Sequence, residues 1–220
     1  MMDGEHTMKV EETADGSRTL YLSGMDEHYH SVKGARTESA HIFVGLGLDY
    51  SSKKDLKVLE IGFGTGLNAY LSLKSAEAAG RKVEYTGIEI NPLPVELIKE
   101  LAYTDDPLFE DLHQAHWNRK VAVTSFFSLY KIAGDFTRYR FDDLFDVIYF
   151  DAFAPDKQPE MWSRELFDYL YVITNEGGVL TTYCAKGEVR RMLQSAGFTV
   201  ERLPGPPGGK REVLRAIKKK

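Results

Sequence analysis

One aspartate of this chain stands where an enzyme of the open α/β type would hold a reacting group. The run Val147 to Phe150 is apolar and rich in β-formers, and it ends abruptly in Asp151. Pro155 and Pro159 then keep the chain out of regular strand or helix. Ligands of open α/β sheets bind just beyond the carboxyl ends of the strands, so a carboxylate there can do acid–base chemistry. The alternative is a solvated aspartate that caps an ordinary turn.

A glycine-rich loop closes an earlier strand, expected at residues 57–63. Its glycines are spaced G-x-G-x-G, and glycine lets a ligand approach the backbone closely. A dinucleotide fingerprint needs G-x-G-x-x-G, which this spacing does not supply. The stretch resembles the first motif of class I S-adenosylmethionine-dependent methyltransferases, E-x-G-x-G-x-G, whose loop wraps the methionine part of the cofactor. The resemblance implies cofactor contacts from Glu60, Gly62, Phe63, Gly64, Thr65, Gly66 and Asn68.

Two further strand ends support a nucleoside-containing cofactor. Glu89 ends the next expected strand, 23 residues after Gly66, and a carboxylate there can accept hydrogen bonds from both ribose hydroxyls. Gly134 and Asp135 follow the third strand and resemble the family's adenine-contacting position. Asp151 completes the predicted cofactor set. Together these positions favour S-adenosyl-L-methionine, although Glu89 on its own fits NAD equally well.

The string from Asp151 to Trp162, DAFAPDKQPEMW, resembles one family in particular. It is similar to the tRNA 5-methylaminomethyl-2-thiouridine methyltransferases, which comprise the methyltransferase half of bifunctional MnmC and stand-alone MnmD. The similarity extends over residues 20–217, with Gln158 in place of a commoner Asn. It implies methyl transfer to the exocyclic amine of 5-aminomethyl-(2-thio)uridine at the tRNA wobble position. The family's FAD-dependent oxidase step would then fall to a separate partner acting upstream.

In this reaction a neutral amine attacks a sulfonium methyl, and Asp151 is the predicted catalytic residue because it can accept an N–H bond and align the lone pair. Two rivals stay open: methylation of a small-molecule amine, and a nucleotide-binding oxidoreductase on the same fold. For the substrate-contact candidates named next, core packing or a surface role is the alternative to ligand contact. The resemblance implies substrate contacts from Tyr29, Glu38, Phe153, Pro155, Lys157, Lys210 and Arg211.

Strands and helices alternate from residue 57 onward, which predicts a mostly parallel sheet covered on both faces. We expect a class I, Rossmann-like methyltransferase fold with seven strands, the last two pairing as an antiparallel hairpin. Residues 1–19 are expected to be a flexible segment with a short hairpin around Asp15-Gly16, and residues 20–220 a single domain. The expected strands are 57–63, 83–90, 127–133, 146–151, 177–185, 198–203 and 211–217, and a helical insertion is expected at 109–117.

Composition excludes several classes of protein. The net charge of −5 is unevenly placed: residues 186–220 carry ten Lys/Arg and three Glu, and the remainder is acidic. That basic region could meet phosphates, or could equally be a solvated tail. Cys184, the single cysteine, cannot form an internal disulfide and supports no metal cluster. No apolar run could span a bilayer and the N-terminus is no signal peptide, so a cytoplasmic location is expected.

Overall fold

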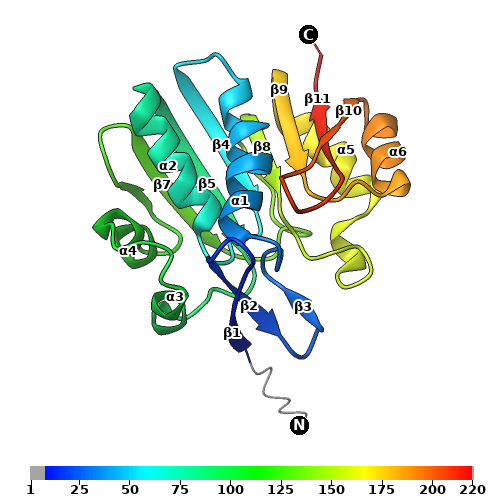
Figure 1. Cartoon of the computed structure of the whole chain (residues 1–220). Helices are drawn as coiled ribbons and strands as arrows, with labels where there is room; N and C mark the ends of the chain where they lie inside the picture. The colour runs from blue at the N-terminus through cyan, green and yellow to red at the C-terminus, as the bar shows by residue number, and fades with distance from the viewer. Residues whose placement is uncertain (1–7, 220) are drawn as a thin grey trace.

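The computed structural model describes residues 8–219, which fold into a large sheet with helices on both faces and a small sheet beside it (Figure 1). The large sheet has eight strands in the order β10-β11-β9-β8-β4-β5-β7-β6. Its strands are β4 (Asp55–Ile61), β5 (Lys82–Glu89), β6 (Lys120–Ala122), β7 (Phe127–Ala133), β8 (Phe145–Phe150), β9 (Thr174–Thr182), β10 (Thr199–Pro204) and β11 (Glu212–Ile217).

The class I methyltransferase architecture is confirmed, with one strand more than expected. The strands β7, β5, β4, β8 and β9 run parallel, and β10 and β11 form the expected antiparallel terminal hairpin. The extra strand is β6, which pairs antiparallel with β7 at the sheet edge. Its three residues are too short and too exposed to leave a pattern of alternating hydrophobicity in the sequence.

The central strands are apolar throughout because both faces of the sheet are covered. Successive residues face opposite clusters: Val147 and Tyr149 pack on one face, Ile148 and Phe150 on the other. Helices α1 (Ala35–Ser39), α2 (Leu67–Ala79), α3 (Val95–Leu101) and α4 (Pro107–Gln114) belong to the first side, and α5 (Arg164–Ile173) and α6 (Gly187–Ala196) to the second. The helical insertion expected at 109–117 is α4, which lies slightly earlier; Asp106 is its N-cap, and the Asp106 side chain accepts a hydrogen bond from Leu108 N.

The N-terminal segment is ordered where a flexible start was expected. In place of a loose stretch over residues 1–19, β1 (Met8–Glu12) and β2 (Arg18–Leu22) form an antiparallel hairpin around the expected turn, and residues 1–7 lie outside the described part. β3 (Glu27–His28) adds a third strand to this small sheet. Because Leu20 is fully buried in the main core, we propose that the domain includes this hairpin. In the part of the chain that the structure describes, no helix combines the length and apolar character of a membrane span.

The strand order reverses next to β4. After β5 and β7 the chain returns to the other side of β4 with β8 and β9. In open α/β sheets this reversal opens a crevice between the loops that leave the strands in opposite directions. The fold therefore brings the loops after β4, β5 and β8, which contain the glycine loop, Glu89 and Asp151, to one edge.

Candidate active site

A cavity of about 770 Å³ opens at this carboxyl edge of the sheet, between the strand ends and the N-terminal segment. Its walls come from regions far apart in the chain, from Met8 to Lys210. Most of the predicted site residues contribute to it. Those that line the cavity are Tyr29, Glu38, Gly62, Phe63, Gly64, Thr65, Asn68, Glu89, Gly134, Asp135, Asp151, Phe153 and Lys210.

The glycine loop leaves β4 with no space for side chains at two of its positions. Gly62 adopts a φ of +90°, and a Cβ there would lie 2.5 Å from the backbone oxygen of Asp151. Gly66 adopts a φ of +71° at the start of α2, and its Cβ would lie 2.8 Å from the His113 ring. Both features require glycine. Gly66 does not itself line the cavity, so its contribution is to let the loop turn into α2.

Glu89, at the end of β5, is held against the glycine loop. One carboxylate oxygen accepts a hydrogen bond from Gly64 N at 3.0 Å, and the other accepts one from Asn91 N at 2.9 Å. Burial raises the pKa of Glu89, and the backbone hydrogen bonds oppose that rise. Each carboxylate oxygen keeps a further lone pair for a ligand, so the geometry suits a pair of neighbouring hydroxyl groups.

The third strand end completes this side of the cavity. Gly134 N donates to the backbone oxygen of Glu89 at 2.9 Å, which brings the loop after β7 beside β5. Asp135 turns back on its own loop, where it accepts hydrogen bonds from the backbone and hydroxyl of Thr137 at 2.9 and 2.7 Å. These hydrogen bonds therefore hold the loop after β7 at the side of the space next to Glu89.

Asp151 lies on the opposite wall, directly after β8. Its Oδ2 accepts a hydrogen bond from Asn68 Nδ2 at 2.8 Å, and its backbone N–H donates to Ile61 O at 3.0 Å. Burial raises the pKa of Asp151 to about 8, with the charge of Glu38 acting in the same direction. Asn68 and Lys210 partly oppose this rise. A carboxyl with such a pKa exchanges protons readily near neutral pH, which suits it to act as a general acid or base toward an amine.

Glu60 was expected to contact the cofactor, but the structure places it behind the cavity wall. It is almost fully buried in β4 and its Oε1 accepts from Asn68 Nδ2 at 2.9 Å. Burial, reinforced by the nearby charge of Asp151, raises its pKa well above the usual range, so it is kept neutral. Its role in this structure is to orient Asn68, whose Nδ2 also reaches Asp151.

The N-terminal segment forms the roof of the cavity. The ring of Tyr29 meets that of Phe153 edge-on at 5.1 Å, which closes an apolar wall beside Asp151. His30 is buried, and its Nε2 lies 2.6 Å from the Thr65 hydroxyl of the glycine loop. Burial lowers the pKa of His30 to about 4, so its imidazole is neutral near pH 7. This contact fixes the N-terminal segment against the glycine loop.

Three residues predicted to contact the substrate lie outside the cavity. Pro155 shapes the loop but does not line the space. Lys157 is partly covered and forms an ion pair with Asp26 at 3.6 Å. Arg211 points to solvent. The structure does not bring these three residues to Asp151.

Sequence reasoning missed Tyr183. It follows β9, the parallel neighbour of β8, and its hydroxyl donates to Ala152 O at 2.8 Å, directly beside Asp151. The signal was available, because Tyr183 lies near the carboxyl end of the strand expected at 177–185 and so belongs to the same edge of the sheet. Other lining residues that had no signal of their own are Met25, Glu27, Asn91, Phe136, Thr137 and Met161.

Comparison with known proteins agrees with this geometry. A family model described as S-adenosyl-L-methionine-dependent methyltransferase matches residues 120–219. The chain is 33% identical over 210 residues to the tRNA 5-methylaminomethyl-2-thiouridine biosynthesis bifunctional protein MnmC of Pseudomonas fluorescens, covering 86% of this chain and 32% of that protein. The MnmC of an Azoarcus species is 29% identical over 220 residues, covering 90% and 34%. The chain thus spans about a third of the length of these curated relatives.

A solved structure is similar along nearly the whole chain. The crystal structure of MnmC2 from Aquifex aeolicus superposes with a TM-score of 0.80 at 26% identity, covering 99% of this chain and 72% of that one. The chain therefore has the fold of the class I S-adenosyl-L-methionine-dependent methyltransferases. Along most of its length the chain resembles MnmC proteins. The expected fold and the expected resemblance to MnmC proteins are confirmed.

Proposed function

We propose that this chain transfers the methyl group of S-adenosyl-L-methionine to the exocyclic amine of 5-aminomethyl-(2-thio)uridine at the tRNA wobble position. The observation that carries the proposal is Asp151, a carboxyl with a pKa near 8 that shares one cavity with the glycine loop and Glu89. The similarity to MnmC proteins, whose name refers to tRNA 5-methylaminomethyl-2-thiouridine, supplies the substrate class.

The residues around the glycine loop fit the cofactor. The loop offers close backbone approach at Gly62 and Gly64, and Glu89 offers two acceptors for the ribose hydroxyls. Asn68 Oδ1 is buried without a hydrogen-bond partner in residues 8–219, and the side chain lines the cavity, so it can accept from the cofactor's amino group. Asp135 and Gly134 would bound the adenine. When bound, S-adenosyl-L-methionine supplies an electrophilic methyl on a positively charged sulfur.

The role of Asp151 follows from the charge of the substrate. An aliphatic ammonium has no free lone pair, so the amine must lose a proton before it attacks. Asp151 in its carboxylate form can accept that proton or hold the N–H that remains. S-adenosyl-L-methionine, when bound, would supply the methyl group and leave with the electron pair of the carbon–sulfur bond. Where Asp151 holds the N–H and keeps its charge, its carboxylate would stabilise the positive charge that develops on nitrogen. Tyr29 and Phe153 would keep water away from this end of the cavity.

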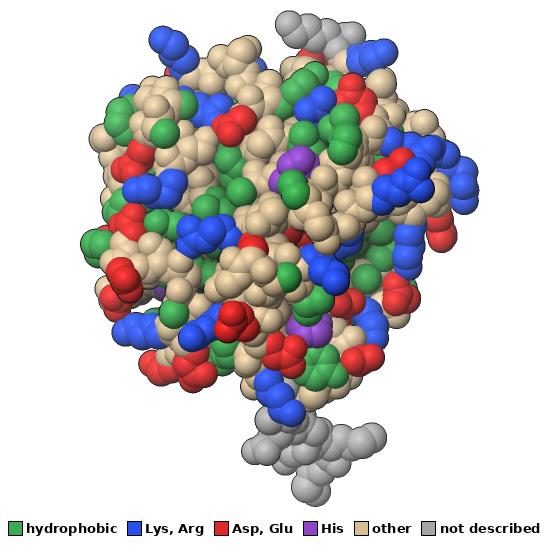
Figure 2. Space-filling model, in the orientation of Figure 1, with side chains coloured by type: hydrophobic (Ala, Val, Ile, Leu, Met, Phe, Trp, Pro, Cys, Tyr) green, Lys and Arg blue, Asp and Glu red, His purple; other side chains and the backbone are tan. Residues whose placement is uncertain are grey.

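The basic side chains of the C-terminal region could serve the tRNA. Figure 2 shows Lys and Arg side chains gathered on the side of the molecule occupied by α6 and the terminal hairpin. Arg191 and Arg211 are exposed there. We propose that they contact tRNA phosphates and that an FAD-dependent oxidase acts upstream to expose the amine. Binding of tRNA should then weaken steeply as salt rises.

The test offers labelled S-adenosyl-L-methionine with tRNA that carries 5-aminomethyluridine. We expect label to enter this tRNA and not a matched tRNA that lacks the aminomethyl group. Absence of transfer, at concentrations where the cofactor is shown to bind, would refute the function. Equal transfer to a free small amine, with no response to salt, would favour methylation of a small molecule instead.

A further inference from the structure

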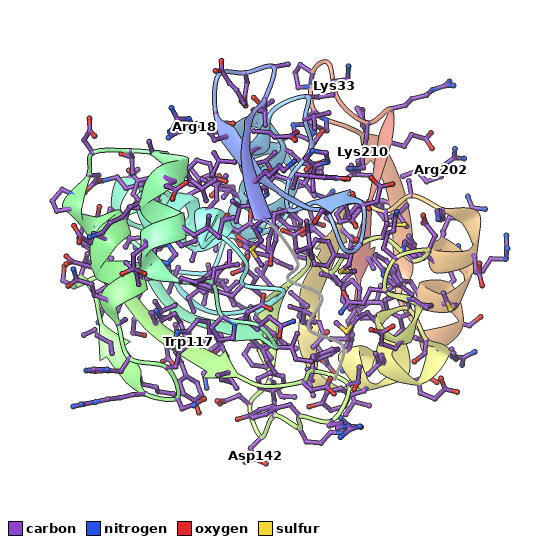
Figure 3. All side chains as sticks on the ribbon, turned by 90° about the horizontal axis from the view of Figure 1, so that it is seen from below. Arg18, Lys33, Trp117, Asp142, Arg202 and Lys210 are labelled. Atoms are coloured by element: carbon purple, nitrogen blue, oxygen red, sulfur yellow. The ribbon has the colours of Figure 1, made fainter. Side chains whose placement is uncertain are left out.

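Lys210 was expected to contact the substrate, and its side chain turns into the cavity. It lies in the loop between β10 and β11, and its Nζ is 3.0 Å from Glu38 Oε1. The same ammonium lies 4.3 Å above the ring of Tyr183. In Figure 3, Lys210 lies close to the N-terminal elements, whereas Arg202 of β10 points outward. With 39% of its side chain exposed, Lys210 closes the cavity mouth from the C-terminal side.

Glu38 is a carboxylate that needs such a partner. Only 8% of its side chain is exposed, and its second oxygen accepts a hydrogen bond from Ser31 N at 3.0 Å. A nearly buried charge without a cation is costly. It also faces Asp151, where it makes a second negative charge harder to form. Lys210 is the cation that offsets Glu38 at this place.

Other charged or titratable groups around Asp151 do not compensate Glu38. The buried Glu60 on β4 is kept neutral by burial, and Tyr85 on β5 and Tyr183 after β9 both have pKa values raised chiefly by burial, so they too are neutral near pH 7. The balance of charge around Asp151 therefore depends on the pair formed by Glu38 and Lys210.

We propose that Lys210 is a positioning residue for methyl transfer: by neutralising Glu38 it keeps Asp151 able to ionise and to receive the proton of the substrate amine. The proposal rests on the proposed function and assigns Lys210 to the chemistry at the amine. It separates this lysine from neighbouring basic residues such as Arg211, which stay available to phosphates.

The first experiment follows methyl transfer against pH in Lys210→Met. The charge of Lys210 lowers the pKa of Asp151, and loss of a nearby opposite charge raises a carboxyl pKa by about one unit or more, so the acidic limb of kcat should move up by about one pH unit. At pH 7 the rate should fall about tenfold, because both proteins are then mostly protonated at Asp151. Lys210→Arg should retain the profile. The control is Lys33→Met, the same loss of charge at an exposed lysine with no role in the cavity, which should leave the profile unchanged.

The second variant removes both charges. In Glu38→Gln/Lys210→Met the like charge beside Asp151 has gone with its partner, so the acidic limb should return close to that of the unmodified protein. A phosphate contact predicts a different pattern: a higher KM for tRNA at every pH, a weaker response to salt, and no rescue by Glu38→Gln. That pattern, or an acidic limb that does not move in Lys210→Met, would overturn the proposal.

A titration without substrate separates this inference from the proposed function. Infrared spectra of the protein can follow the protonated carboxyl of Asp151, assigned by its loss in Asp151→Asn. The midpoint should rise in Lys210→Met and return in the double variant, whether or not tRNA is methylated. An unmoved midpoint contradicts the role of Lys210 even if methyl transfer is observed.

Discussion

The two ends of the cavity are built in different ways. At the cofactor end, the glycine loop, Glu89 and Gly134-Asp135 follow three strands that are successive neighbours in the sheet, and backbone groups make most of the contacts. The other end, around Asp151, is here called the amine end. There the side chains of Glu38 and Lys210 meet, although they are 172 residues apart in the chain. The first end is a backbone cradle set by local sequence, whereas the second is a charge cluster that exists only in the folded chain. Variants at the first should change affinity, and variants at the second should change turnover and its pH dependence.

The largest effect is expected from Asp151→Asn. The amide keeps the size of the side chain but cannot take a proton, so methyl transfer should fall by about 10²- to 10⁴-fold. Affinity for S-adenosyl-L-methionine, measured by calorimetry, should change little. The matched control is Asp156→Asn, in the same loop but exposed and paired with Lys186. Near-native turnover in Asp151→Asn would remove Asp151 from the chemistry.

Gly62→Ala should affect both ends of the cavity, because Gly62 belongs to the glycine loop and its added Cβ would press on the backbone oxygen of Asp151. We expect cofactor affinity and turnover to fall together, each by at least about tenfold, a change of about 1.4 kcal/mol in free energy. Gly80→Ala is the control, since Gly80 has a φ of +60° but open space around its Cβ. It should cost about 1 kcal/mol of unfolding free energy and leave affinity intact. Equal effects of the two substitutions would show that backbone strain, and not the contact with Asp151, sets the result.

Glu89→Gln tests the cofactor end alone. The amide still accepts one hydrogen bond, but it loses the second acceptor and places an NH₂ group against a backbone N–H, from Gly64 or Asn91. Affinity for S-adenosyl-L-methionine should weaken about tenfold, while kcat at saturating cofactor stays within about twofold. A loss confined to kcat would mean that Glu89 acts on the reacting groups and that the comparison is wrong.

The smallest expected effect concerns the buried Glu60. Its pKa is raised well above normal in the folded chain, so the folded state holds a proton that the unfolded state loses above about pH 4.5. Stability therefore falls as pH rises from there toward the folded-state pKa. Glu60→Gln has no such proton, and its free energy of unfolding in urea should fall less between about pH 5 and pH 8. Asp151, with its pKa raised to about 8, should leave part of the slope in place. An unchanged slope in Glu60→Gln would show that Glu60 is ionised in the folded state.

The same contrast explains how much the sequence could predict. Strand ends are local signals, so the glycine loop, Glu89 and Asp151 were placed on one edge from spacing alone. Glu60 was expected at the cofactor but is buried behind the cavity wall. The strand geometry of β4 decides which way its side chain points, and its position in the motif does not show this direction. The inward turn of Lys210 depends on how a hairpin loop packs on a helix at the other end of the chain. No pattern of hydrophobicity within either segment records that contact.

The most direct test is the single-turnover rate of methyl transfer to tRNA carrying 5-aminomethyluridine, measured from about pH 6 to pH 10 with saturating cofactor. The rate should rise with an apparent pKa near 8, as Asp151 becomes a carboxylate, and this limb should vanish together with most of the rate in Asp151→Asn. An Asp151→Asn protein with the same rate and the same limb would contradict the account, because the proton of the amine would then leave by another route.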